Sequence, residues 1–136
     1  MEDQLVTIRT ALLAREKGFN TPTYYYSNPQ GIFYTPNPVD WNNEETGPWD
    51  DLSMPTQKQL QNWLKIYNCL IEIQEYCLSE EKAILGPHYA VFVTQDAAID
   101  KQNPLGYFKI YKQALEYALY IGLNLIDDNT LLHELF

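Results

Sequence analysis

The sequence predicts an α+β protein with about three main helices packed on a small, mostly antiparallel sheet. Apolar residues recur every three or four positions in three stretches, as in helices with one buried face. Between residues 69 and 77 they recur at every second position, as in a strand with one buried face. An aromatic hairpin and a long tryptophan-bearing loop complete the expected fold. With 136 residues, the chain is expected to be a single domain whose core needs no disulfide or metal.

The first helix is expected over residues 4–17. Asp3 is a candidate N-cap, and Gly18 is the residue type that commonly follows the end of a helix. Arg15 and Lys17 near its end complement the helix dipole. The buried stripe of this helix would consist of Leu5, Ile8, Ala11 and Leu12.

An aromatic hairpin is predicted over residues 24–34, and a long loop after it. Pro29 and Gly31 supply the backbone angles that a turn requires, and the hairpin is expected to extend or flank the main sheet. Residues 35–53 read as an irregular loop anchored by Trp41 and Trp49. The acidic residues of this loop do not follow the spacing of a calcium site, so no metal site is expected.

The central part of the chain predicts a helix followed directly by a buried strand. Thr56 and Gln59 fit a capping box at the start of the helix, and Asn68 is its expected end. Strands are then expected over residues 69–77 and 89–94, with the second in the middle of the sheet because it is apolar on both faces. A third strand is expected over 107–110, antiparallel to the second. The buried helix face would carry Leu60, Trp63, Leu64 and Tyr67.

The last long helix is expected over residues 111–126. Its apolar arc is about 200° wide, which is wider than one contact surface requires. A second partner for this face is therefore expected, either the tail at 129–136, which reads as a short helix, or another subunit. We predict a homo-oligomer formed through this helix or the tail.

The charge balance excludes several classes of partner. The formal net charge is -9, from 9 basic and 18 acidic side chains, and such a chain lacks the clustered cations that bind DNA, RNA or anionic membranes. No apolar run approaches the length of a membrane span. The N-terminal residues lack the layout of a secretory signal, so a cytoplasmic location is expected.

No motif of an enzyme is recognisable. The chain has no nucleotide-binding glycine loop, nucleophile elbow or zinc-protease motif. His88 and His133 are expected in a turn and in the tail. Cys69 and Cys77 are too far apart on one strand for a disulfide and are expected to be buried apolar residues. We therefore predict a protein that is not an enzyme and needs no cofactor.

Several local patterns recur together in this chain. They are Ala11 with Lys17-Gly18-Phe19, the Trp41-Asn42-Asn43 triplet, Pro55-Thr56-Gln57 with Trp63-Leu64, Ile71 with Ile73, and Tyr111 to Leu115 with Gly122-Leu123. Together they are similar to a group of small proteins found in phages and prophages of gut bacteria. The resemblance extends from residue 11 to residue 126 and rests mainly on packing positions. The chain departs from the group at Lys109-Ile110, where a Thr or Ser cap is expected, and in its acidic, leucine-rich tail.

The resemblance implies a non-enzymatic phage accessory protein that acts inside an infected bacterial cell. One class of such proteins consists of sponges that counter Thoeris or CBASS defence by sequestering a nucleotide-derived immune signal. Aromatic side chains would stack on the base, and cations would hold the phosphates. The candidate ligand-binding residues are Tyr24, Tyr25, Tyr26, Phe33, Tyr34, Trp41, Asn42, Asn43 and Trp49, with Arg9, Arg15, Lys58 or Lys65 as cations.

Other interpretations of the same residues stay open. The tyrosines of such a segment more often pack a hairpin than a base, and Lys58 and Lys65 fall opposite the buried face of their helix, as solvated residues do. In place of a sponge, the protein could be an acidic inhibitor or nucleic-acid mimic that binds a host protein, or a minor phage structural factor. A sponge requires a concave aromatic site with local positive charge, whereas a mimic requires carboxylates along one exposed face.

Overall fold

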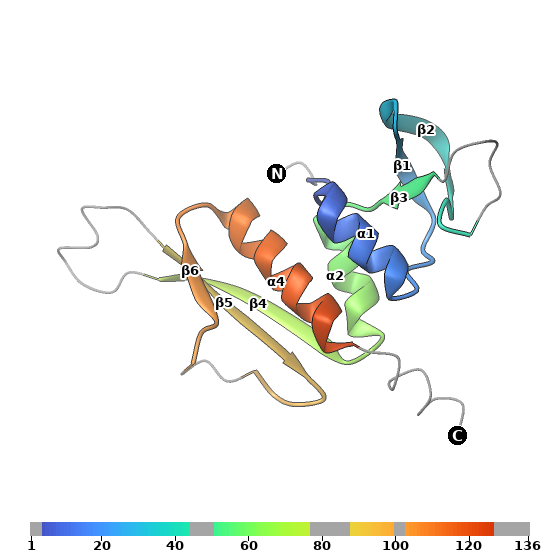
Figure 1. Cartoon of the computed structure of the whole chain (residues 1–136). Helices are drawn as coiled ribbons and strands as arrows, with labels where there is room; N and C mark the ends of the chain where they lie inside the picture. Colours follow the sequence, from blue (N-terminus) through green and yellow to red (C-terminus); the bar gives the residue numbers. More distant parts are fainter. Residues whose placement is uncertain (1–3, 44–50, 77–87, 100–102, 127–136) are drawn as a thin grey trace, which may run out of the picture. The chain divides into compact units, whose positions relative to one another are not determined.

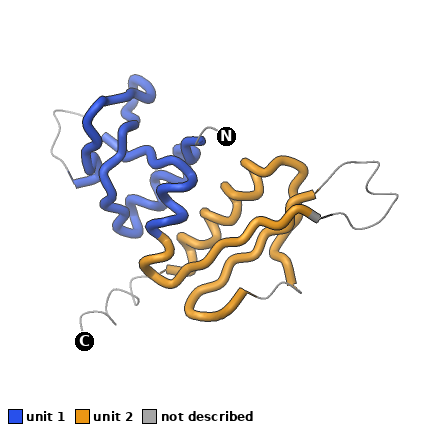
Figure 2. Tube along the Cα trace, turned by 180° about the vertical axis from the view of Figure 1, so that it is seen from behind, with its two compact units in different colours: residues 1–63 blue, residues 64–136 orange. Residues whose placement is uncertain are grey.

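The structure is a computed structural model that describes residues 4–43, 51–76, 88–99 and 103–126 (Figure 1). The chain divides into two compact units, residues 1–63 and residues 64–136 (Figure 2). The predicted α+β class is confirmed, because the described residues form three helices and two three-stranded antiparallel sheets. Folding as one cooperative domain stays a prediction.

The first unit contains α1 (Ile8–Glu16) and a sheet of β1 (Thr23–Asn28), β2 (Gly31–Val39) and β3 (Leu52–Met54). The strand order is β2–β1–β3, and β1 pairs antiparallel with both neighbours. The helix α1 packs against β3. The predicted hairpin thus forms a sheet of its own with β3, and both ends of the segment expected as an irregular loop belong to strands.

The predicted first helix is too long at its N-terminus. The helix α1 begins at Ile8, and Thr7 is its N-cap, with a hydroxyl that accepts the backbone N–H three residues further on at 3.2 Å. Val6 donates its backbone N–H to the carbonyl of Pro55 at 3.0 Å. Because residues paired in this way have an extended backbone, the helix cannot extend through them toward the N-terminus. The predicted start and the predicted cap at Asp3 are therefore wrong.

The buried face of α1 also differs from the predicted stripe. Thr10, Ala11 and Ala14 are buried, whereas Ile8 and Leu12 are 49% and 44% exposed. Short side chains therefore form the buried face of α1. The prediction was right for Ala11 and wrong for the two larger apolar residues, because it assumed that the largest apolar side chains face the core.

The helix α2 (Gln57–Lys65) begins with the predicted capping box. The hydroxyl of Thr56 accepts the N–H of Gln59 at 3.1 Å, and the amide oxygen of Gln59 accepts the N–H of Thr56 at 2.9 Å. On the predicted face, Leu60 and Trp63 are buried. The Trp63 ring meets Phe19 edge to face, with 5.4 Å between the ring centroids. The first unit thus has a core in which an aromatic pair is central.

The second unit contains β4 (Cys69–Tyr76), β5 (His88–Gln95), β6 (Gly106–Phe108) and α4 (Tyr111–Leu125). The sheet order is β4–β5–β6, with both pairs antiparallel, so the prediction that the second strand is central is confirmed. The helix α4 lies along this sheet and contacts all three strands (Figure 1). His88, which was expected in a turn, is the first residue of β5.

The central part of the predicted apolar arc of α4 is buried, whereas Leu125, which widened the predicted arc, is 40% exposed. Gly122 in this arc packs closely on Cys69 of β4. A Cβ atom at Gly122 would be 3.0 Å from Sγ of Cys69 and 3.1 Å from Cδ1 of Leu64, so any side chain at this position would force those neighbours to shift. The buried residues of the arc are Ala114, Leu115, Ala118, Leu119, Gly122 and Leu123.

Several predictions concern residues outside the described part of the chain. These include Trp49, Cys77, His133 and the tail at 129–136. The predicted homo-oligomer is likewise untested and stays a prediction. Among the described residues, no helix combines the length and apolar character that crossing a membrane requires.

Candidate functional site

The predicted ligand-binding residues that the structure describes lie in the first unit, except Lys65, which belongs to the second. The aromatic residues lie on the β1–β2 hairpin and in the turn after β2. They do not form one site, however. They separate into two clusters, because neighbouring residues of a strand point to opposite faces of the sheet.

The first group consists of Tyr24, Tyr25 and Tyr34, and is called the tyrosine cluster below. Tyr25 of β1 pairs with Tyr34 of β2 in the strand register, and their ring centroids are 5.3 Å apart. An irregularity between Thr23 and Tyr25 shifts the register. This shift lets Tyr24 also stack on Tyr34, with 6.3 Å between the centroids and 16° between the ring planes. Tyr24 is 44% exposed and Tyr34 is 61% exposed, so the cluster offers aromatic surface to a partner.

The second group consists of Tyr26, Phe33 and Trp41. Tyr26 stacks on Phe33, with 5.6 Å between the ring centroids, and lies against Trp41, with 4.1 Å between the ring centroids. The indole Nε1 of Trp41 donates to the carbonyl oxygen of Thr23 at 3.3 Å. Trp41 therefore attaches the turn after β2 to the start of β1, which is a packing role.

Asn42, predicted as a ligand-binding residue, holds the sheet together. Its side-chain oxygen accepts the backbone N–H of Ser53 at 3.0 Å, and its backbone N–H donates to the Ser53 hydroxyl at 3.2 Å. Its side-chain nitrogen donates to the carbonyl of Phe19 at 3.0 Å. The side-chain nitrogen of Asn43 donates a hydrogen bond to the carboxylate of Asp40 at 2.6 Å. Because both ends of the Asn42 amide are occupied, this residue fixes β3 rather than offering itself to a ligand.

The predicted cations lie on other elements than the exposed tyrosines. Arg9 and Arg15 belong to α1, which packs against β3. In the strand order β2–β1–β3, Tyr34 on β2 is at the opposite edge of the sheet. Lys58 and Lys65 are exposed on α2. The topology therefore does not assemble the aromatic and the cationic halves of a nucleotide site around Tyr34.

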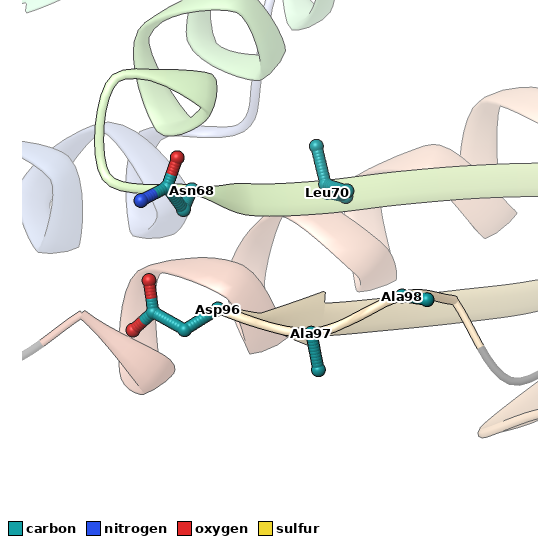
Figure 3. A pocket seen from close by; sticks show the side chains of 5 residues that line it. All are labelled: Asn68, Leu70, Asp96, Ala97 and Ala98. Atoms are coloured by element: carbon teal, nitrogen blue, oxygen red, sulfur yellow. The ribbon is translucent and has the colours of Figure 1, made fainter.

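A pocket that the sequence did not predict lies in the second unit. It has a volume of about 450 Å³ and is lined by residues before and within β4 and after β5. Asn68 and Asp96 have positive φ angles of 58° and 59°, and the N–H of Asp96 donates to the carbonyl of Asn68 at 3.1 Å. Figure 3 shows their side chains together at one end, with the apolar residues along the rest of the pocket. The lining residues are Asn68, Leu70, Asp96, Ala97 and Ala98.

Charge at this pocket comes from Asp96. Within the described part of the chain, neither its carboxylate nor the Asn68 side chain has a hydrogen bond or ion pair. Burial, reinforced by the charge of Asp96, raises the pKa of the Cys69 thiol to about 11. Cys69 is therefore protonated near neutral pH and is a poor nucleophile. The described residues contain no group of three or more His, Cys, Asp or Glu that could hold a metal ion.

Comparisons with protein-family models, with curated proteins and with solved structures find no match to this chain. The similarity to phage proteins, and the sponge activity that it implies, therefore stay predictions. Two surfaces are thus candidates for binding, the tyrosine cluster of the first unit and the pocket of the second.

Proposed function

We propose that this protein is a non-enzymatic binding protein and that its tyrosine cluster recognises another protein. The observation that carries this proposal is the stacked and exposed pair Tyr24 and Tyr34 on a hairpin at the edge of a sheet. Tyrosines contribute large rigid surfaces at little cost in conformational entropy, and they dominate the binding energy of many protein interfaces.

The character of β2 favours a protein as the ligand. Among the described residues, β2 is an edge strand that pairs only with β1. None of its nine residues is charged, although the whole chain has a net charge of -9. Ile32 is 50% exposed beside Tyr34. An uncharged aromatic strand on an acidic protein suits a partner whose apolar contact patch is surrounded by basic residues. The opposite charges of the two proteins accelerate their encounter, and the aromatic side chains supply affinity.

A second candidate function is the sequestration of a nucleotide-type signal, as the resemblance implies. The near-parallel rings of Tyr24 and Tyr34 support it, because a base stacks readily on an exposed aromatic plate. The position of Arg9 and Arg15 weakens it, since α1 packs at the opposite edge of the sheet from β2. Action in an infected bacterial cell belongs to both candidates as an expectation.

Affinity measurements with matched variants test the proposal. A partner captured from a bacterial lysate is purified, and its affinity is compared for the wild type, Tyr34→Ala and Tyr107→Ala. Tyr107 is 46% exposed on β6 and serves as a control outside the hairpin. We expect Tyr34→Ala to weaken binding about 30-fold, since a central interface tyrosine contributes about 2 kcal/mol. Equal affinities of the three proteins would refute the proposal.

The nucleotide candidate has a test of its own. A thermal-shift panel of cyclic oligonucleotides, cyclic and linear ADP-ribose derivatives and common nucleotides is applied to the wild type and to Tyr34→Ala. A ligand at a hundred times its Kd stabilises the folded state by about 2.7 kcal/mol, which raises Tm by several degrees. A rise that Tyr34→Ala abolishes would favour the nucleotide. A flat panel would remove this candidate for those compounds.

A further inference from the structure

We infer that the pocket between the ends of β4 and β5 binds the guanidinium group of an arginine side chain presented by a partner protein. The pocket is formed wholly by residues of the second unit. The inference is therefore independent of the tyrosine cluster and of the function proposed for it.

The backbone holds the two polar residues of the pocket in place. Asn68 directly precedes β4 and Asp96 directly follows β5, and both have φ near +60°. Among residues with a side chain, Asn and Asp tolerate this left-handed conformation best. The bond from the Asp96 N–H to the Asn68 carbonyl links the two positions. The carboxylate and the carboxamide are thus positioned side by side by the strand ends (Figure 3).

The chemistry of the lining matches a guanidinium group. The Asp96 carboxylate has no hydrogen bond or ion pair among the described residues, so it can accept two parallel N–H donors from one arginine. The side-chain oxygen of Asn68 can accept a third. Leu70, Ala97 and Ala98 provide apolar surface for the methylene groups of the same side chain.

The size and composition of the pocket argue against other occupants. The pocket is open to solvent, since all five of its lining residues are exposed. Its volume of about 450 Å³ is within the range of about 300–1,000 Å³ for ligand sites, so one arginine side chain can enter it. One carboxylate and one amide are too few ligands for a protein-bound calcium ion. An anionic ligand would be repelled by Asp96. A lysine ammonium lacks the planar fork that pairs with a carboxylate through two bonds.

An NMR titration of the full-length, ¹⁵N-labelled protein tests this inference. The probe is N-acetyl-arginine methylamide, which carries the guanidinium group but no free carboxylate, and N-acetyl-glutamine methylamide is the uncharged control. We expect saturable shifts of the amide signals of Leu70, Asp96, Ala97 and Ala98 with the arginine probe and none with the glutamine probe. Absence of saturable shifts with the arginine probe would overturn the inference.

Variants connect the shifts to Asp96. Asp96→Asn retains a residue that tolerates the left-handed conformation, so the fold is preserved, and it should bind the probe about fivefold more weakly, as expected for loss of an exposed ion pair. Asn68→Asp adds a second carboxylate and should tighten binding. Glu75→Gln makes the same charge change at an exposed residue that does not line the pocket, and should leave the affinity unchanged.

The outcomes separate this inference from the proposed function. Tyr34→Ala should bind the arginine probe as the wild type does, whatever its effect on a protein partner. If Glu75→Gln weakened probe binding as much as Asp96→Asn, the attraction would come from net charge and the pocket assignment would be wrong. Unchanged affinity in Asp96→Asn would equally overturn it.

Discussion

The two sheets of this protein differ in how their surfaces are covered. In the second unit, α4 lies along the sheet and contacts β4, β5 and β6, and its arc of small and large apolar residues is buried. In the first unit, α1 packs on β3, and seven of the nine residues of β2 are exposed. The second sheet is therefore mainly a scaffold for its helix. The first leaves the aromatic strand β2 exposed.

The two units also differ in the interactions that hold their sheets in place. Close apolar packing around Gly122 fixes the second sheet to α4. In the first unit, the side chain of Asn42 bonds both Ser53 and Phe19. The exposed strand β2 is positioned by its backbone pairing with β1 and by the Asn42 bonds of the turn that follows it, rather than by burial of its own side chains.

The largest loss of stability is expected for Trp63→Ala. Trp63 is 4% exposed and packs edge to face on Phe19, so its removal leaves a cavity in the core of the first unit. The free energy of unfolding should fall by about 3–5 kcal/mol, measured by urea denaturation. A loss below about 1 kcal/mol would show that this pair is not a core of the first unit.

Overpacking should destabilise the second unit. In Gly122→Leu, the new side chain has to enter the space now occupied by Cys69 and Leu64. We expect a loss of about 1–3 kcal/mol, measured by chemical denaturation. The control is Asn124→Leu, which introduces the same side chain at an exposed position of α4. Equal stability of Gly122→Leu and the wild type would contradict the close approach of α4 to β4.

Loss of the polar attachment should destabilise the first unit by a smaller amount. Asn42→Ala removes the bonds to Ser53 and Phe19 and leaves the buried N–H of Ser53 without that partner. The expected loss is about 1–2 kcal/mol. Hydrogen exchange should locate it, with faster exchange at Ser53 and unchanged exchange in β5. Uniform acceleration in both units would contradict the assignment of Asn42 to the first sheet.

The raised pKa of Cys69 predicts a pH dependence of stability. Its folded-state pKa of about 11 lies above the ordinary thiol pKa of 9.0, so the unfolded chain loses the proton first as the pH rises. The stabilisation is complete below about pH 9 and decreases toward pH 11. At pH 10, the difference amounts to about 1 kcal/mol. Comparing the pH dependence of the wild type with that of Cys69→Ala isolates this contribution from the tyrosines, and identical slopes would contradict it.

The sequence predicted periodic elements well. The central part of the α4 arc, the central position of β5 and the capping box at Thr56 are all local patterns, and the structure confirms them. Three-residue strands carry too little periodicity, so β3 (Leu52–Met54) was interpreted as the end of a loop. The start of α1 depends on a backbone bond to Pro55, which is remote in the sequence.

The candidate surfaces were predictable only in part. The aromatic composition identified Tyr24 and Tyr34, but their stacking depends on a register shift that no local pattern encodes. The hydrogen bonds of Asn42 to Ser53 and Phe19 were not predicted, because these partners lie on segments before β1 and after β2. The pocket joins Asn68 and Asp96, which are remote in the sequence and lie at the same end of the β4–β5 pair. Its one signal in the sequence is that both residue types tolerate a left-handed conformation.

Whether the tyrosine cluster binds a partner protein is tested most directly by the affinity of the purified partner for Tyr34→Ala, compared with its affinity for Tyr107→Ala. The free energy of unfolding of each variant is measured as well. The exposure of Tyr34 predicts that its removal changes stability by less than about 1 kcal/mol and weakens binding about 30-fold. If Tyr34→Ala bound the partner as tightly as Tyr107→Ala and the wild type, the tyrosine cluster would not be the recognition surface.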